Sequence, residues 1–298
     1  MPVDPAPRPR GPYGVAYVVL AVPDVASTVE FLGYHVGLAL EEHDATHAYL
    51  RTGTEHHCLE LVQDASLSAF RYDTVCYTVE SPAVLADLRR RVVDSGLEPL
   101  SLDKSAQALC DDGFAVTDPN GTRVELITDP VVYAEEPWPD LRPQCLVHPF
   151  VITDRYDETL RFYTDVLGFL VSDYVEDFTV FLRGENRYHH SLAIRRADRF
   201  SLEHLCFIMG SLDGVMRRRA RAQYKNVRIL GDVVNHSAST SLAFYLFDDR
   251  HGPRYELCDG HRVLTPEEHE GHRPRRLRRD PRNIDVWRAA SDDRTWAH

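Results

Sequence analysis

Residues 146–169 read LVHPFVITDRYDETLRFYTDVLGF, and this stretch decides the fold because its pattern occurs twice in the chain. A β-branched, apolar run of strand length leads into a segment whose apolar residues are three and four positions apart, which is typical of a strand followed by an amphipathic helix. Three residues of the first half recur 131 positions later: Thr28, Phe31 and Gly37 correspond to Thr159, Phe162 and Gly168. The two halves therefore look like copies of one unit.

The first half is expected to contain a strand–helix–strand pattern twice. The apolar run VAYVVLAV at 15–22 is followed by a helix start at Pro23-Asp24. The other expected elements are strands at 47–52, 57–62 and 73–80, a helix at 83–96, and strands at 114–118 and 123–128. The last two strands are joined by a segment with Asn120-Gly121, a pair that tolerates positive φ and favours a hairpin. The first half thus reads β-α-β-β-β twice.

The same pattern returns in the second half. Its expected elements are a strand at 145–152, a helix at 156–167, strands at 169–175, 179–184 and 190–195, a strand at 202–209, a helix at 212–223, and strands at 241–248 and 254–260. The predicted organisation is a flexible arm at 1–12, an N-terminal domain at 13–131, a Pro-rich linker at 132–143, a C-terminal domain at 144–260 and a polar tail at 261–298. The tail is interpreted as a solvated or partner-covering segment, or as a flap over a pocket.

Composition narrows the class of protein. The chain has 298 residues, 43% of them hydrophobic, which is enough to fill the cores of two ordinary domains. Its net charge of -12 disfavours nucleic acid and anionic membrane surfaces as partners. No apolar run is long enough to span a bilayer, and the six cysteines form no CxxC pair. We therefore expect a cytoplasmic protein whose cysteines are reduced.

Three residues in matching strands could hold a metal ion: His148, His204 and Glu256. Two imidazoles and one carboxylate leave three coordination positions open, as in non-heme Fe(II) oxygenases. The spacing from His148 to Glu256 equals that from Tyr17 to Glu125, 108 residues, which ties the group to the repeat. The alternative is that both histidines are hydrogen-bonded core residues. Because the first half has Tyr17 where the second has a histidine, we expect it to be a scaffold without metal.

These residues resemble the metal ligands of a known family, the type I extradiol ring-cleavage dioxygenases (catechol 2,3-dioxygenases) of the vicinal oxygen chelate superfamily. The resemblance covers about 15–260 and implies an α+β fold of four βαβββ modules, paired into two domains that are each an open mixed β-barrel around a cavity. It also implies that His148, His204 and Glu256 bind Fe(II), with Mn(II) as the alternative metal.

Three further residues match catalytic positions of that family. His190, 14 residues before His204, matches the histidine beside the oxygen site, with the adjacent His189 as an alternative. His236 and Tyr245 match the pair that bonds the substrate hydroxyls. A neutral imidazole could accept a catechol proton, and a donor facing O2 could stabilise developing negative charge.

The resemblance implies an enzyme that uses O2 to open the ring of a catechol beside its two hydroxylated carbons. The product would be of the muconic semialdehyde type, as in the catabolism of aromatic hydrocarbons, and the enzyme is expected to be a homo-oligomer. Two other classes remain as alternatives. One is another metal enzyme of the superfamily, a glyoxalase or a hydroxyphenylpyruvate-type oxygenase, and the other is a metal-free protein that binds a small molecule.

Overall fold

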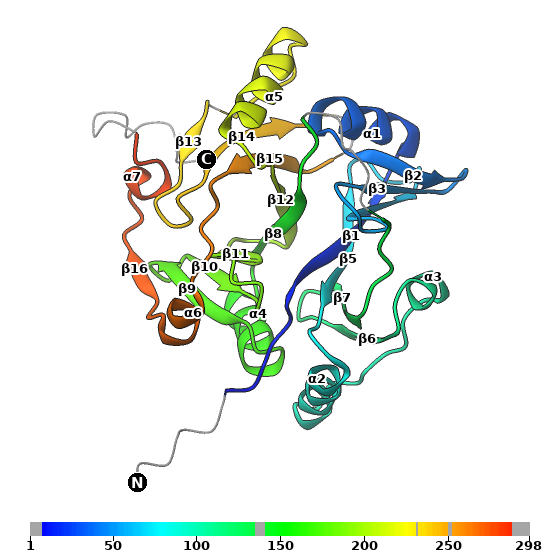
Figure 1. The fold of residues 1–298 in the computed structure, drawn as a ribbon, viewed down its shortest axis with the longest axis vertical. Helices are drawn as coiled ribbons and strands as arrows, with labels where there is room; N and C mark the ends of the chain where they lie inside the picture. The colour runs from blue at the N-terminus through cyan, green and yellow to red at the C-terminus, as the bar shows by residue number, and fades with distance from the viewer. Residues whose placement is uncertain (1–7, 135–140, 231, 250–251, 288–298) are drawn as a thin grey trace.

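The strands of the protein form two mixed sheets, one in each half of the chain (Figure 1). The computed structural model describes residues 8–134, 141–230, 232–249 and 252–287. The first sheet has the order β2-β3-β4-β1-β5-β7-β6. Its strands are β1 (Gly14–Val22), β2 (Ala39–His43), β3 (His47–Arg51), β4 (Leu59–Gln63), β5 (Arg71–Thr78), β6 (Asp112–Thr117) and β7 (Arg123–Thr128). The pairs β1–β4 and β5–β7 are parallel.

The second sheet repeats this arrangement and extends it at its edge. Its order is β13-β14-β15-β12-β8-β11-β10-β9-β16, so that β8 and β12 are central neighbours as β1 and β5 are in the first sheet. The strands are β8 (Cys145–Thr153), β9 (Leu170–Val175), β10 (Thr179–Arg183), β11 (Leu192–Arg196), β12 (Ser201–Ile208), β13 (Val234–Asn235), β14 (Leu242–Phe247), β15 (Arg254–Asp259) and β16 (Arg275–Leu277). The expected α+β class is confirmed, and both sheets are open within the described residues.

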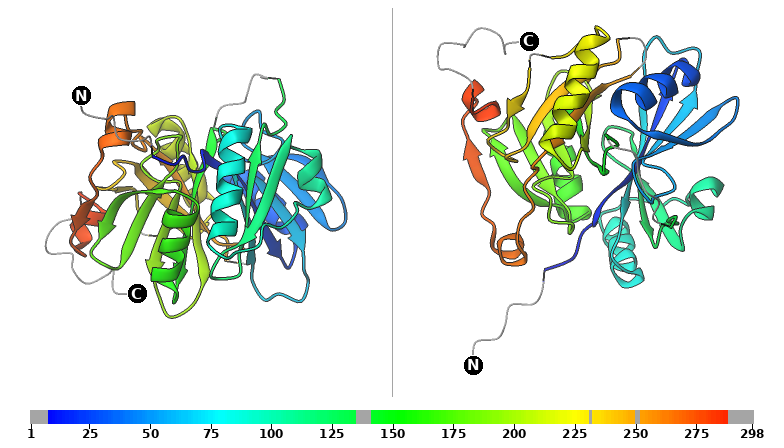
Figure 2. Two further views of the ribbon diagram at one scale, coloured as in Figure 1. Left: turned by 90° about the horizontal axis from the view of Figure 1, so that it is seen from below. Right: turned by 45° about the horizontal axis from the view of Figure 1, so that its top comes forward.

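The helices lie outside the sheets, and the two halves are side by side (Figure 2). They are α1 (Val25–Phe31), α2 (Pro82–Asp94), α3 (Lys104–Ala108), α4 (Tyr156–Arg161), α5 (Leu212–Tyr224), α6 (Pro266–Gly271) and α7 (Pro281–Ile284). No helix in the described ranges is long and apolar enough to cross a membrane.

The repeated sequence forms the same local structure in both halves. The Thr28 hydroxyl donates to the Asp24 carbonyl at 2.8 Å, and the Thr159 hydroxyl donates to the Arg155 carbonyl at 2.8 Å. In both places the α-helix continues into one π-helical turn. A glycine with positive φ follows each, at 98° for Gly37 and 81° for Gly168. Side chains other than glycine are strained in this left-handed region, which explains why glycine stands at both positions.

The expected three strands after each helix are not all formed. In the second unit, the first of these three strands is not formed. Leu100 stands at its position and makes only an isolated bridge to Ala115. In the fourth unit β13 has two residues. The halves nevertheless share an apolar core, since Tyr77 packs edge-on against Phe169 with ring centroids 5.0 Å apart.

The described parts of the chain ends pack on the second half. Strand β16 of the expected tail pairs in parallel with β9. In the expected arm, the Arg8 guanidinium donates to Glu185, and the Gly11 amide donates to the same carboxylate at 3.1 Å. His269 of α6 lies 3.1 Å from Glu185 as well. Residues 1–7 of the arm, 135–140 of the linker and 288–298 of the tail lie outside the described residues.

Replacing Glu185 with glutamine is expected to destabilise the protein by about 3 kcal/mol, because Arg8 and Arg10 would lose the buried carboxylate with which they pair. Burial raises the pKa of Glu185, but hydrogen bonds from His269, Arg8 and Gly11 lower it more, so the net pKa is below the ordinary value. A lowered carboxyl pKa stabilises the fold above the unfolded-state pKa, and this stabilisation is lost as the pH falls.

Urea unfolding of wild type and Glu185→Gln at pH 7 and pH 4 measures both effects. The difference in unfolding free energy should be smaller at pH 4. The control is Glu270→Gln, since that side chain is half exposed and its ion pair contributes little. Equal stability of wild type and Glu185→Gln at pH 7 would contradict this interpretation of the network.

Candidate metal centre

His148, His204 and Glu256 lie on three adjacent strands in the middle of the second sheet. Cys206 of β12 is in register with His148 of β8 on one side and with Glu256 of β15 on the other. His204 is two residues before Cys206, so its side chain leaves the same face of the sheet. Strand pairing therefore brings together residues that are 56 and 108 positions apart in the chain.

The three side chains direct their polar atoms at one point. The His204 Nε2 is 3.0 Å from Glu256 Oε2 and 3.2 Å from His148 Nε2, and the His148 Nε2 is 3.6 Å from Glu256 Oε2. Two ligand atoms ~2.1 Å from an octahedral metal and at right angles to each other would be ~3.0 Å apart. All three residues are buried. The donor set thus fits a divalent metal on one face, with the opposite face left open.

The charges of the group favour a cation. Burial raises the pKa of Glu256, but the neighbouring imidazoles of His148, His204 and His236 lower it more, so the group is a carboxylate. Burial lowers the pKa of His148 to about 4, which keeps this ring neutral. Burial also lowers the pKa of His204, but the Glu203 carboxylate raises it more, to about 9. Without metal, the His204 ring therefore carries a proton on both nitrogens at neutral pH. A metal ion would displace the proton on Nε2.

Glu203 is a residue that the sequence analysis did not identify. Its carboxylate accepts a hydrogen bond from His204 Nδ1 and another from Arg254 at 2.5 Å. Adjacent residues of a regular strand point to opposite faces, but β12 has a register shift against β8 between Leu202 and His204. Such a bulge re-aims side chains. Glu203 can therefore orient the ring of its own neighbour, and only its position next to His204 hinted at this.

Changing Glu203 to glutamine is expected to weaken divalent metal binding about 10- to 100-fold, since a carboxylate that holds a ligating imidazole raises its basicity. Calorimetric titration of the metal-free protein with Mn(II) measures the change. The matched control is Glu125→Gln in the first half, which should bind Mn(II) like wild type. Unchanged affinity in Glu203→Gln would show that this carboxylate does not support the metal centre.

His190, rather than His189, faces the three expected ligands. The His190 Nε2 is 3.3 Å from His148 Nε2, and the ring centroids of the two histidines are 4.0 Å apart. His189 points to Asp173, with Nε2 2.8 Å from the carboxylate and both side chains fully buried. Burial lowers the pKa of His190 well below its ordinary value, so that its ring is neutral.

His236 and Tyr245 form a hydrogen-bonded pair on another side of the group. The His236 Nδ1 is 2.9 Å from the Ile284 carbonyl, which can only accept, so this nitrogen carries a proton. In neutral His236 the Nε2 is then an acceptor, and it lies 2.9 Å from the Tyr245 hydroxyl. The same Nε2 is 3.4 Å from Glu256 Oε1. The end of α7 thus fixes which nitrogen of His236 faces the centre.

His261 is a further histidine of the site that was not predicted. It forms a second potential ligand group with His148 and His190, whose atoms all lie within 4.8 Å of one another. It is 6% exposed, and neither ring nitrogen has a hydrogen-bond partner in the described parts of the chain. The one feature of the sequence that pointed to His261 was its position shortly after the strand that carries Glu256.

Tyr17 and Glu125 bond to each other at the corresponding place in the first half. The Tyr17 hydroxyl donates to Glu125 Oε2, and Arg123 donates to Glu125 Oε1 at 2.7 Å. Within the described ranges, both groups of three potential metal ligands include His148 and lie in the second half.

Known proteins share the fold that carries this group of residues. Residues 146–257 match the model of the Glyoxalase/Bleomycin resistance protein/Dioxygenase superfamily. This part of the chain is similar to that superfamily, and the two-sheet fold is shared by extradiol dioxygenases of known structure, as the resemblance implied. No curated protein matches the sequence.

Three solved structures illustrate the likeness. The Mn(II)-bound glyoxalase from Novosphingobium aromaticivorans has a TM-score of 0.81 at 24% identity, over 93% of this chain and 91% of that one. A 2,3-dioxygenase from Pseudomonas sp. KL28 has a TM-score of 0.80 at 18% identity, over 92% and 100%. Homoprotocatechuate 2,3-dioxygenase from Arthrobacter globiformis has a TM-score of 0.79 at 20% identity, over 96% and 92%. These proteins share the fold of this chain, and their names include both metal-bound glyoxalase and dioxygenase.

Proposed function

We propose that the protein is an extradiol dioxygenase that opens the ring of a catechol-type diol with O2 at an Fe(II) centre held by His148, His204 and Glu256. The observation that supports the proposal is that the three expected ligands, a further histidine and a histidine–tyrosine pair meet at one site. His190 lies next to His148, and the hydrogen-bonded pair of His236 and Tyr245 lies next to Glu256. Mn(II) is the alternative metal, because it accepts the same ligands.

The bound metal would hold the diol and O2 close together and conduct electrons between them. His236 Nε2, the ring nitrogen that does not contact the Ile284 carbonyl, is placed to accept a proton from a substrate hydroxyl. Burial raises the pKa of Tyr245 well above its ordinary value, so its hydroxyl stays protonated and donates. This pair can therefore deprotonate a diol and orient its oxygen.

His190 is placed to act on the oxygen side. Its ring is neutral and buried, so it can donate one hydrogen bond without the cost of a buried charge. A fixed donor in a dry site stabilises negative charge as it develops on oxygen and can return a proton. The chain's own residues thus supply an acceptor for the substrate and a donor for oxygen.

A glyoxalase-type metal enzyme is the second candidate, and the similarity to a Mn(II)-bound glyoxalase keeps it open. In the described residues, however, the second ligand group around His148 consists of histidines and adds no second carboxylate. A hydroxyphenylpyruvate-type oxygenase and a metal-free binding protein are the remaining alternatives. The proposal also includes the expected role in aromatic catabolism, a homo-oligomeric state and a cytoplasmic location.

The test is to load the protein with Fe(II) without oxygen and to add substituted catechols and then O2. An extradiol dioxygenase consumes one O2 for each diol and forms a yellow ring-opened product. A glyoxalase-type enzyme or a binding protein consumes no O2 with these compounds. Failure of every catechol in the series with fully loaded protein would overturn the proposal.

A further inference from the structure

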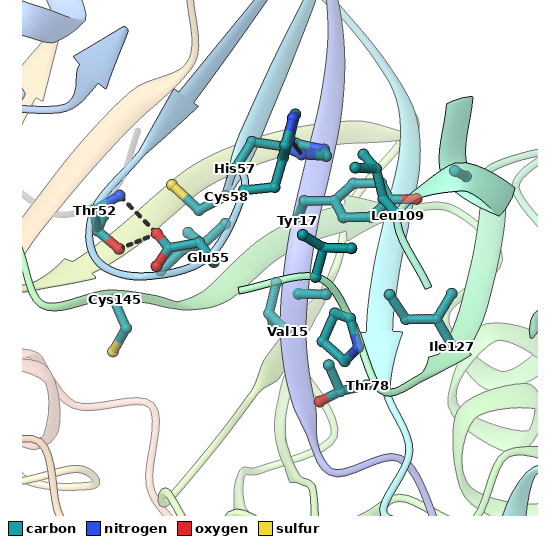
Figure 3. A pocket seen from close by; sticks show the side chains of 16 residues that line it. Val15, Tyr17, Thr52, Glu55, His57, Cys58, Thr78, Leu109, Ile127 and Cys145 are labelled. Carbon is teal, nitrogen blue, oxygen red and sulfur yellow. Dashed lines mark hydrogen bonds between the residues drawn. The ribbon is translucent and has the colours of Figure 1, made fainter. Parts of the chain in front are cut away.

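Two adjoining cavities, lined mainly by residues of the first half, lie beside the pair Tyr17 and Glu125. One has a volume of about 180 Å³ and the other about 280 Å³, and Tyr17, His57, Ala106 and Leu109 line both. We call the smaller one the first-half cavity. Its walls are mainly apolar and include Val15, Tyr17, Leu109 and Ile127 (Figure 3). Val131 and Leu146 also line it. No ligand of the candidate metal centre lines it.

His57, a residue in the wall of this cavity, has one ring nitrogen with unused hydrogen-bonding capacity. His57 is 6% exposed, and its Nε2 has no partner among the described residues. Other polar groups of the wall are bonded within the protein: the Thr52 hydroxyl donates to Glu55 at 2.6 Å, as Figure 3 shows, and the Thr78 hydroxyl donates to the Gly14 carbonyl at 3.3 Å. A buried nitrogen without a partner is costly, so a ligand or a water is expected to bond it.

The state of His57 determines what can bind there. Burial lowers the pKa of His57 to about 3, so the ring is neutral at physiological pH. Its Nδ1 is 3.0 Å from the Nδ1 of His56, and either nitrogen can be the donor of this bond. The Nε2 of His57 is accordingly an acceptor in one tautomer and a donor in the other. A hydroxyl group can match both states, because it donates and accepts.

We propose that the first-half cavity is a second small-molecule site, which binds a monocyclic phenol with its hydroxyl on His57 Nε2 and its ring among Val15, Leu109 and Ile127. The volume of about 180 Å³ suits this class, since an apolar cavity of ~150 Å³ in another protein binds benzene. The site would be separate from the metal centre and does not depend on the reaction proposed there.

The experiment compares two ligands that differ in the hydroxyl, 4-fluorophenol and 4-fluorotoluene. Each is titrated into the full-length, metal-free protein, and binding is followed by ¹⁹F NMR. Wild type should bind both saturably. In His57→Phe, 4-fluorophenol should bind about fivefold more weakly, because one neutral hydrogen bond is lost. Binding of 4-fluorotoluene should change less than twofold. Ala106→Leu, which fills the cavity, should weaken both ligands about tenfold.

His148→Ala serves as the control for the other half and should bind 4-fluorophenol like wild type. Retained binding of 4-fluorotoluene shows that the cavity of His57→Phe is folded. If Ala106→Leu does not fold, Val131→Trp fills the cavity from its rim, where Val131 is 41% exposed. The proposal is overturned if wild type shows no saturable binding, if His57→Phe binds 4-fluorophenol like wild type, or if binding is lost only in His148→Ala.

Discussion

The His148→Ala protein is expected to lose its bound divalent metal and, with it, ring-cleavage activity. Only two of the three convergent ligands would remain, and the alanine leaves the His204 Nε2 and the Glu256 carboxylate without the third member of the group. The measurement is the iron content per chain after anaerobic loading and gel filtration, together with the rate of catechol cleavage. Iron and turnover should fall together.

The matched control is the corresponding position in the first half. Tyr17→Phe removes only the hydroxyl that donates to Glu125, and Arg123 still pairs with that carboxylate. Glu125→Ala removes the carboxylate itself. Both variants should keep the iron content of wild type. Loss of iron in either would show that the first half takes part in metal binding, and wild-type iron in His148→Ala would show that the ligand group is misassigned.

The His190→Phe protein is expected to keep its metal and to turn over ~100-fold more slowly, because a fixed donor to developing negative charge is removed. Phenylalanine preserves the ring contacts with His148 and Phe181, whose centroids are 4.0 and 4.9 Å away. Steady-state turnover and metal content of the same preparation separate the two effects.

His189→Phe is the control for this prediction. It breaks the buried pair with Asp173 and should lower the melting temperature, with a smaller effect on turnover of the protein that remains folded. Wild-type turnover in His190→Phe with full metal content would mean that another group, such as the adjacent His261, supplies the donor.

The sequence predicted the parts of the fold that depend on a repeated pattern. The strands and helices around Thr28 and Thr159 follow from apolar spacing and from glycines that tolerate positive φ. The convergence of His148, His204 and Glu256 was predicted because corresponding strands of a repeat have corresponding neighbours. Their metal-binding role stays a prediction, as do the roles of His190, His236 and Tyr245.

The residues that were missed depend on features without a periodic signal. Glu203 reaches its neighbour only because β12 has a bulge, and bulges leave no pattern in the apolar residues. His261 and the Ile284 carbonyl come from the segment after the repeat, where the short elements α6, β16 and α7 are placed by contacts with the second half. The cavity beside His57 forms between several strands and α3, so sequence order could not show which side chains meet there.

The most direct test of the account is O2 uptake by the Fe(II)-loaded protein in the presence of a catechol that it turns over, measured for wild type and His148→Ala in parallel. The account predicts one O2 consumed per catechol and a yellow product with wild type, and neither with the variant. Equal uptake by both proteins, or a wild type that holds iron and consumes no O2 with any catechol, would contradict it.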